Sequence, residues 1–333
     1  MSLLADVDRI GRETLYTLID RVDPGGRAGI ANELSFRLAE ATRTIAAPDA
    51  VDRAVVGAFA RDGYLPCGQA FDARQVAEIR AHLDGCPVYD GHVIEHSDRR
   101  PDTVEALARR THLAAYDYRS TITAPHLLTL ANDPRLLAIA EGYLGCVPTL
   151  YSVHAWWSFG GRDTRARLTQ AFHRDPDDFR FCVLFLYLTD VASDADGPHQ
   201  MIRSSHQLEG VQAFLESLRQ RGEPVDPGSA SRFFSGQGYE AEAELGVDRL
   251  FADATVTIRG PAGTGFLVDT YGLHRGLQPA QGRRLVAWAR YGFGPNNGSV
   301  RGPGYPVPRR ELTCMLGDDP RTRYVNRLLV DFG

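Results

Sequence analysis

The feature that most constrains the fold is a series of short, apolar, strand-like segments in the second half of the chain. The segment 148–159 alternates its side chains with a period of two and is rich in aromatic residues, which is typical of a strand with two different faces. Turn residues separate further segments of this kind, which we place at 168–174, 179–189, 198–203, 253–259, 264–269 and 283–293. Short strands in this succession predict a mainly β core with added α-helices. We expect an antiparallel double-stranded β-helix, a jelly-roll or cupin-like barrel, with helices packed on it.

Two histidines and an aspartate lie at the ends of these segments. His173 and Asp175 are two positions apart, so in a strand both side chains point to the same side while Arg174 points away. His274 lies much later in the chain, where a distant strand can supply a third ligand. Two histidines and one carboxylate are the ligand set of mononuclear non-haem Fe(II) sites, and this set leaves coordination positions open. We therefore predict one divalent metal bound by these three residues, with room for a chelating cosubstrate and dioxygen.

The three residues belong to an ordered set of motifs. The set comprises His173-Arg174-Asp175, Tyr187-Leu188-Thr189-Asp190-Val191, Gly197-Pro198-His199, Ser204-Ser205-His206, His274 and Arg284. On these motifs, the stretch from about residue 50 to residue 300 resembles the phytanoyl-CoA dioxygenase-like branch of the Fe(II)/2-oxoglutarate oxygenases. One departure is Arg203-Ser204-Ser205-His206, where the family often has Pro-Gly-Ser-His. This departure changes a turn and does not touch the expected metal ligands.

The resemblance implies an oxidation. The cofactors it implies are Fe(II) and 2-oxoglutarate, and the reaction it implies is hydroxylation of a substrate with release of succinate and CO2. Family members that halogenate usually lack the metal-binding carboxylate, so the presence of Asp175 favours hydroxylation or a related oxidation. We also expect Gln170, Tyr187 and Thr270 to contact the cosubstrate.

An arginine is the expected anchor for the distal carboxylate of 2-oxoglutarate. A guanidinium can hold a carboxylate through two parallel hydrogen bonds and keeps its charge when buried. Arg283 and Arg284 are adjacent in a strand, so only one of them can point inward. Polarity favours Arg283, whose face of the strand is the more apolar. The family spacing from the distal histidine favours Arg284, followed seven positions later by Tyr291. We prefer Arg284 and keep Arg283 as the alternative.

The substrate is less constrained by the sequence. We expect contacts from His154, Trp156 and Trp157 on the aromatic segment, and from Arg162 in the glycine-containing loop that follows it. Core packing is the default interpretation for the two tryptophans, and pocket lining is the alternative. This mixture of side chains suits a polar small molecule.

Other classes of protein remain to be considered. His-Arg-Asp is also the catalytic-loop tripeptide of protein kinases, but the asparagine expected five residues later is replaced by Arg180, and the chain contains no Lys to hold phosphates. Two alternatives stay open, namely a metal-binding cupin-like protein that acts without 2-oxoglutarate and a non-catalytic binding barrel. Succinate formation that depends on Fe(II) and 2-oxoglutarate would separate the main prediction from both.

Composition excludes several kinds of partner. The net charge is −5 and all 37 basic residues are Arg, so no broad basic surface argues for nucleic acid. No apolar run is long enough to span a bilayer, and the first residues lack a signal-peptide core. The five cysteines form no Cys-x-x-Cys pair, which favours reduced thiols. We expect a cytoplasmic protein whose partners are a small-molecule substrate and dioxygen, with no nucleic acid and no membrane.

The expected organisation has three parts. Residues 1–48 are a helical appendage, with helices at 3–22 and 29–46 separated by a Pro-Gly-Gly stop, and they are a candidate contact for a homo-oligomer. Residues 49–300 form the oxygenase domain. Its insert, 207–252, starts as a helix and continues as a long Gly/Pro/Ser-rich stretch, which predicts a mobile lid over the pocket. Residues 301–333 are a tail packed on the domain.

Overall fold

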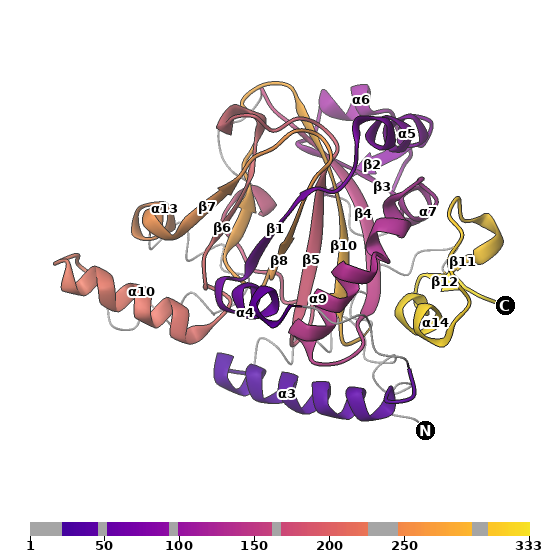
Figure 1. Ribbon diagram of the computed structural model, residues 1–333. Coiled ribbons are helices and arrows are strands. Elements are labelled where there is room, and N and C mark those ends of the chain that lie inside the picture. The colour runs from indigo at the N-terminus through magenta and orange to yellow at the C-terminus, as the bar shows by residue number, and fades with distance from the viewer. Residues whose placement is uncertain (1–21, 46–51, 93–98, 162–167, 226–245, 295–305) are drawn as a thin grey trace.

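Two antiparallel sheets form the centre of the molecule (Figure 1). The structure is a computed structural model, and it describes residues 22–45, 52–92, 99–161, 168–225, 246–294 and 306–333. The larger sheet has seven strands in the order β1-β8-β5-β10-β4-β3-β2, and a three-stranded sheet has the order β7-β6-β9. Their bounds are β1 Tyr64–Gln69, β2 Val88–Asp90, β3 Leu113–Tyr116, β4 Thr149–Phe159, β5 Phe181–Tyr187, β6 His199–Ile202, β7 Thr255–Ile258, β8 Thr264–Val268, β9 His274–Gly276 and β10 Arg283–Gly292.

The two sheets pack on each other through a small apolar cluster. Tyr187 and Phe266 of the seven-stranded sheet contact Met201 and Ile258 of the three-stranded sheet. The Tyr187 hydroxyl also joins the sheets, because it donates to the Ile258 carbonyl at 2.8 Å and accepts from the His199 amide at 2.8 Å. Two facing antiparallel sheets of this kind confirm the predicted jelly-roll core.

The other face of the seven-stranded sheet carries the main hydrophobic core. Side chains alternate along β10, so Leu285 and Tyr291 point into this core while Arg284 and Arg290 point to the opposite face. Helices cover the core side, as Figure 1 shows. They are α4 Arg53–Asp62, α5 Ala73–Asp84, α6 Val104–Ala108, α7 Tyr118–Ile122, α8 Leu127–Ala131 and α9 Pro134–Leu144. The helices therefore lie on one face and leave the space between the two sheets for a pocket.

Aspartates begin several of these helices. The Asp72 side chain accepts a hydrogen bond from the backbone of Gln75, and the Gln75 side chain accepts one from the backbone of Asp72, which forms a capping box. Asp133 caps α9 and is followed by Pro134 at the first helical position, where a missing N–H costs nothing.

The N-terminal helix α3, Pro24–Ala41, corrects one prediction. The Asp-Pro-Gly-Gly sequence, interpreted as a stop, begins this helix, because the Asp23 side chain accepts from the amides of Gly25 and Gly26 at 3.0 Å each. The predicted helix 3–22 lies almost wholly outside the described residues. Figure 1 shows α3 running across the ends of the strands, and its Ala31 belongs to the main core. The described part of the appendage thus packs closely on the domain.

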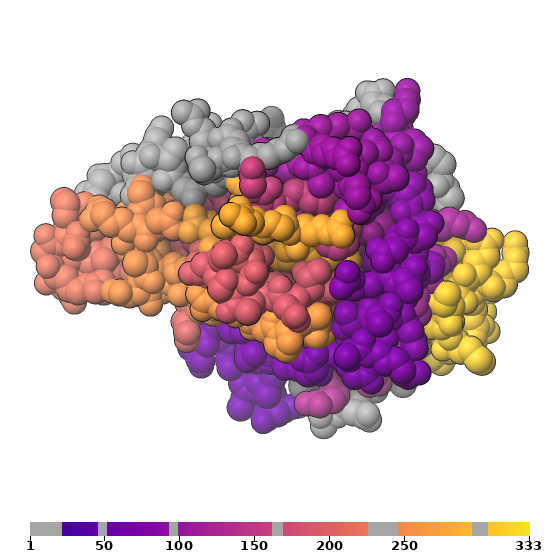
Figure 2. Space-filling view, turned by 90° about the horizontal axis from the view of Figure 1, so that it is seen from above, coloured from indigo at the N-terminus to yellow at the C-terminus, as the bar shows by residue number. Residues whose placement is uncertain are grey.

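The insert and the tail lie at opposite ends of the molecule (Figure 2). The insert contributes α10, Leu208–Gln220, and α13, Val247–Leu250, which form a separate apolar cluster with Phe172 and Leu273. Much of the predicted lid falls outside the described residues. The tail forms a parallel pair of β11 (Val307–Pro308) with β12 (Val330–Asp331), and α14 (Pro320–Asn326) packs against β4. None of the described helices is long and apolar enough to cross a membrane.

Candidate metal centre

The predicted strand 168–174 is wrong, yet His173 and Asp175 still lie close to His274. Its first part is a 3-10 turn, Leu168–Gln170, and His173 makes a single antiparallel bridge to His274. The two residues exchange both backbone hydrogen bonds, at 2.9 and 3.0 Å. A longer ladder does not form because Pro176 has no N–H to donate and restricts the residue before it. Asp175 is instead held by its own amide, which donates to the Thr270 carbonyl at 2.8 Å.

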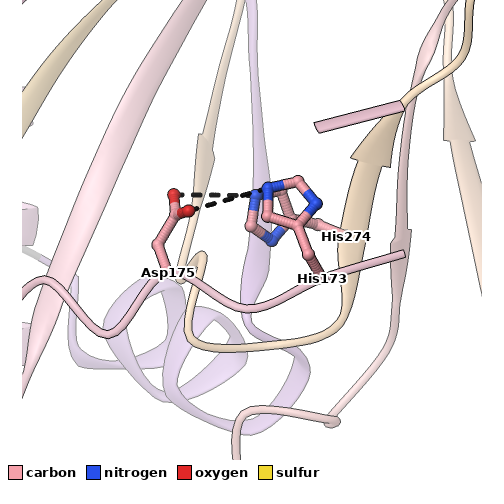
Figure 3. A group of neighbouring side chains, drawn as sticks. All are labelled: His173, Asp175 and His274. Carbon is pink, nitrogen blue, oxygen red and sulfur yellow. Dashed lines mark ion pairs between the residues drawn. The ribbon is translucent and has the colours of Figure 1, made fainter. Parts of the chain in front are cut away.

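The side chains of His173, Asp175 and His274 converge (Figure 3). One Asp175 oxygen lies 3.6 Å from Nε2 of His173, and the other lies 3.7 Å from Nε2 of His274. The three ligand atoms all lie within 4.8 Å of one another, and they are the one such group among the described residues. Both histidines are buried, and the Asp175 side chain is 20% exposed. The three side chains can bind one face of a single metal ion. The remaining coordination positions of the ion would then face the pocket.

Backbone carbonyls fix the orientation of both imidazoles. His173 Nδ1 lies 2.9 Å from the Ala171 carbonyl, and His274 Nδ1 lies 2.9 Å from the Gly272 carbonyl. A carbonyl only accepts, so Nδ1 is the protonated nitrogen in each ring and Nε2 presents its lone pair to the shared centre. This is the outer-shell arrangement that orients metal-binding histidines.

The surroundings of the triad favour a neutral His274 and an ionised Asp175. Burial, followed by the neighbouring His173, lowers the pKa of His274 to about 3. Burial opposes ionisation of Asp175, but His274 and Arg290 outweigh it and hold the pKa of Asp175 below its ordinary value. Arg290 lies 3.3 Å from an Asp175 oxygen and 3.0 Å from an Asp177 oxygen. A neutral His274 and an ionised Asp175 are the forms of these two side chains that bind a cation.

A pocket opens in front of the triad, between the two sheets. Besides the three residues, it is lined by Leu113, Trp156, Ser158, Thr169, Phe185, Tyr187, His199, Gly276, Arg284, Val286, Trp288 and Arg290. The lining comes from β4, β5 and β10 on one side and from β6 and β9 on the other.

The structure decides which of the adjacent arginines faces this pocket. Arg284 is 6% exposed, and its Nη2 donates to the Ser158 hydroxyl at 3.2 Å, while Nε and Nη1 have no partner among the described residues. A Cβ added to Gly276 would lie 2.7 Å from Nη2, so glycine makes room for the guanidinium. Arg283 points outward, where it is 44% exposed and pairs with Glu105 at 3.1 Å. The polarity argument for Arg283 therefore misleads. The side chain that faces the cavity is the buried Arg284 guanidinium, two of whose nitrogens have no partner in the described part of the chain.

The other residues expected at the cosubstrate occupy different places. Tyr187 lines the pocket, but its hydroxyl already bonds the backbone of the three-stranded sheet. Gln170 and Thr270 are buried and are not among the residues that line the pocket. Thr270 contributes through its carbonyl, which accepts from the amide of Asp175.

The residues expected at the substrate divide between the two faces of β4. Trp156 lines the pocket, whereas Trp157 is buried in the main core and donates from Nε1 to the Tyr116 hydroxyl at 2.9 Å. His154 does not line the pocket, and its ring stacks on Trp288 with centroids 5.2 Å apart. Arg162 lies outside the described residues. Period-two alternation explains why neighbouring tryptophans separate in this way.

Sequence reasoning did not single out several residues of the pocket wall, among them Trp288, Arg290 and His199. Trp288 and Arg290 share the face of Arg284 because they follow it at intervals of two and could have been found by that alternation. His199 appeared only as part of a motif. Its ring is 6% exposed and stacks on His274 at 5.5 Å with an interplanar angle of 16°. Burial lowers the pKa of His199 well below its ordinary value, so the ring is neutral.

The residues Arg203-Ser204-Ser205-His206 form a turn in the structure. Ser204 adopts a positive φ of 60°, a region that favours glycine. The Ser205 hydroxyl accepts from the Leu273 amide at 2.7 Å, so the turn supports the residue that precedes His274. The turn contributes no ligand atom to the triad.

Comparisons with known proteins extend only to the backbone. No protein-family model matches the chain, and no curated protein matches it. Among solved structures, it is similar to the epimerase SnoN in complex with Fe3+, alpha ketoglutarate and nogalamycin RO, with 17% identity and a TM-score of 0.49 over 80% of this chain and 95% of that chain. It is also similar to HygX from Streptomyces hygroscopicus with nickel and 2-oxoglutarate bound, with 19% identity and a TM-score of 0.43 over 74% and 89% of the two chains. A third similar structure is EctD from S. alaskensis with 2-oxoglutarate and 5-hydroxyectoine, with 19% identity and a TM-score of 0.44 over 73% of this chain and 77% of that chain. Likenesses at this level carry no argument about activity, which must come from the site itself.

Proposed function

We propose that this protein is an Fe(II)- and 2-oxoglutarate-dependent oxygenase that hydroxylates a polar small molecule, with release of succinate and CO2. The observation that carries the proposal is one pocket that holds both a His173–Asp175–His274 triad and the inward-facing Arg284. The triad suits a divalent metal, and the guanidinium suits the far carboxylate of a dicarboxylate that chelates this metal.

The triad fits Fe(II) by its donor chemistry. It offers two imidazole nitrogens and one carboxylate, all already oriented by backbone contacts and by Arg290. Non-haem Fe(II) oxygenases use this ligand set, because three protein ligands leave positions for cosubstrate and dioxygen. An aspartate in the third position favours hydroxylation over halogenation, since it occupies the place that a halide would need.

The pocket fits 2-oxoglutarate through the unpartnered donors of Arg284. A buried guanidinium with free N–H groups is costly unless a ligand pairs with it, and a carboxylate can accept two parallel hydrogen bonds from it. Gly276 and Ser158 border this guanidinium and leave its Nε and Nη1 unpaired among the described residues. These contacts support Arg284, and not Arg283, as the anchor.

When bound, Fe(II) and 2-oxoglutarate together supply the activation of dioxygen and the oxidation of an unactivated C–H bond. The chain's own residues hold and orient the reactants. Trp156, Phe185 and Trp288 give the pocket an aromatic wall that excludes water. Thr169 and Arg290 add polar groups beside the triad, and this mixed lining supports a polar small molecule as substrate. A cytoplasmic location, where iron stays reduced, agrees with this chemistry, and assembly of copies through the N-terminal helices remains part of the proposal.

The test is succinate formation by the purified full-length chain. Protein loaded with Fe(II) without oxygen is mixed with 2-oxoglutarate, dioxygen and candidate metabolites, and succinate is measured by mass spectrometry. We expect succinate only when both Fe(II) and 2-oxoglutarate are present, and faster formation with the correct metabolite. The variant Arg283→Ala is the matched control, because its side chain lies outside the pocket. Metal binding without 2-oxoglutarate binding would instead support a cupin-like protein of another activity, and absence of metal binding would support a non-catalytic barrel.

A further inference from the structure

Within the part of the chain that the structure describes, one nitrogen of a buried imidazole in the pocket has no hydrogen-bond partner. His199 is 6% exposed and lines the same cavity as the triad and Arg284. Its Nε2 has no partner among the described residues. The ring is packed by Phe185, with centroids 4.7 Å apart, and by Phe266, at 5.4 Å. A buried ring nitrogen that makes no hydrogen bond in such an apolar environment costs free energy. A polar group of a bound ligand can supply the hydrogen bond.

Strand register places this imidazole between the metal centre and the arginine. On β6, His199 is directly opposite Gly276 of β9, and Met201 is opposite His274. Opposite residues of an antiparallel pair point to the same face, and the space that a Gly276 side chain would fill is occupied by the Arg284 guanidinium. On its other side, the His199 ring stacks on His274 at 5.5 Å. His199 therefore neighbours both His274 of the triad and the place beside Gly276 where the Arg284 guanidinium lies.

We propose that His199 is a cosubstrate-binding residue that donates its Nε2–H to the distal carboxylate held by Arg284. This inference rests on the proposed function, because the ligand is a 2-oxo dicarboxylate chelated at the triad. A carboxylate has about four lone-pair sites, so it can accept from the unpaired Arg284 donors and from the imidazole together. Nε and Nη1 of Arg284 and Nε2 of His199 are buried and have no partner among the residues that the structure describes, and one ligand group would thereby pair all three.

The test compares two 2-oxo acids that differ at the distal end. Ni(II)-loaded full-length protein, which binds without turnover, is titrated by calorimetry with 2-oxoglutarate and with 2-oxobutyrate, which lacks the distal carboxylate. For His199→Leu we expect the Kd for 2-oxoglutarate to rise by about tenfold or more, the range of one charge-assisted hydrogen bond. The Kd for 2-oxobutyrate and the affinity for nickel stay at their wild-type values. In His199→Gln, which keeps an N–H at a similar reach, a large part of the 2-oxoglutarate affinity returns.

A second histidine provides the control for folding. His82 lies on α5, where Nε2 is 3.0 Å from the Ser120 carbonyl, and it does not line the pocket. His82→Leu should leave both acids bound as in the wild type, and thermal unfolding of every variant shows that it is folded. Equal loss of both acids in His199→Leu, or loss of neither, would overturn the proposed contact. If wild-type protein binds nickel but neither acid, the proposed function itself fails, and the role of His199 falls with it.

Discussion

Two buried arginines on either side of the metal-binding loop have very different surroundings. Arg174, behind the loop, is 1% exposed. Its Nη1 donates to the Ser205 carbonyl at 2.9 Å and also to the Tyr271 carbonyl. Arg284, in front of the loop, is 6% exposed and has the Ser158 hydroxyl as its hydrogen-bond acceptor. Burial is thus nearly equal, but two backbone carbonyls accept from Arg174, whereas among the described residues Nε and Nη1 of Arg284 have no partner.

The difference suits a structural role for Arg174 and a ligand-binding role for Arg284. Behind the loop, the Tyr271 ring lies against the Arg27 guanidinium at 3.4 Å, and Arg27 donates to the Asp178 carbonyl at 3.1 Å. These contacts tie α3 to the segment that carries the metal ligands. In the pocket, donors face a cavity, which is costly in the free protein and becomes favourable when a ligand supplies acceptors. The following changes test this contrast, from the largest expected effect to the smallest.

The largest effect is expected at the triad. Replacing His173, Asp175 or His274 by Ala removes one of three ligand atoms, so each variant should lose nearly all of its bound iron. Elemental analysis after loading with Fe(II) and desalting measures this loss. Iron content equal to that of the wild type in all three variants would show that the metal is held elsewhere.

The second effect concerns the adjacent arginines. Arg284→Ala should raise the Kd for 2-oxoglutarate by about two to three orders of magnitude, which corresponds to roughly 3–4 kcal/mol for a lost buried charge pair. Nickel affinity should change little, because the guanidinium does not touch the triad. Arg283→Ala, whose side chain pairs with Glu105 outside the pocket, should bind 2-oxoglutarate as the wild type does. The opposite ranking of the two variants in calorimetry would move the anchor to Arg283.

The third test compares how much each of the two buried arginines, Arg174 and Arg284, contributes to the free energy of unfolding. Arg174→Met leaves two buried carbonyls without their donor and should lower the free energy of unfolding by about 2–5 kcal/mol. Arg284→Met removes an incompletely paired buried charge and should change stability by less than about 1 kcal/mol, or increase it. Urea unfolding of the metal-free, ligand-free protein measures both values. Similar losses in the two variants would mean that Arg284 is as much a structural residue as Arg174.

The smallest effect is expected from the neighbouring tryptophans of β4. Trp157→Phe loses a buried hydrogen bond and core volume, so stability should fall by about 1–3 kcal/mol while 2-oxoglutarate binding is kept. Trp156→Phe, on the pocket side, should change stability by about 1 kcal/mol or less. Intrinsic fluorescence should respond less to 2-oxoglutarate in Trp156→Phe than in Trp157→Phe. A ligand response carried by Trp157 would contradict the assignment of the two faces.

Much of the fold could be predicted because strand alternation is a local signal. The segments that became β4, β5, β6, β7, β8 and β10 were all expected within a few residues of their bounds. The errors occurred where a local pattern has two interpretations. Asp23-Pro24 can end one helix or begin the next, and the segment before Pro176 is apolar enough to suggest a strand but cannot extend a ladder.

The sequence by itself determined the alternating strands, the order of the motifs and the identity of the residues that can bind a metal, because these depend on residue type and spacing. Only the tertiary structure decided how the three ligands come together. His173 pairs with His274 through a single β-bridge, and Asp175 lies in the loop that follows and not on the face of a strand. The tertiary structure also decided that Arg284 and not Arg283 faces the pocket, and that His199 lies between that arginine and the triad. These outcomes depend on which strand pairs with which and on where Gly276 leaves space, and such long-range contacts are set by packing across the two sheets, which no local pattern encodes.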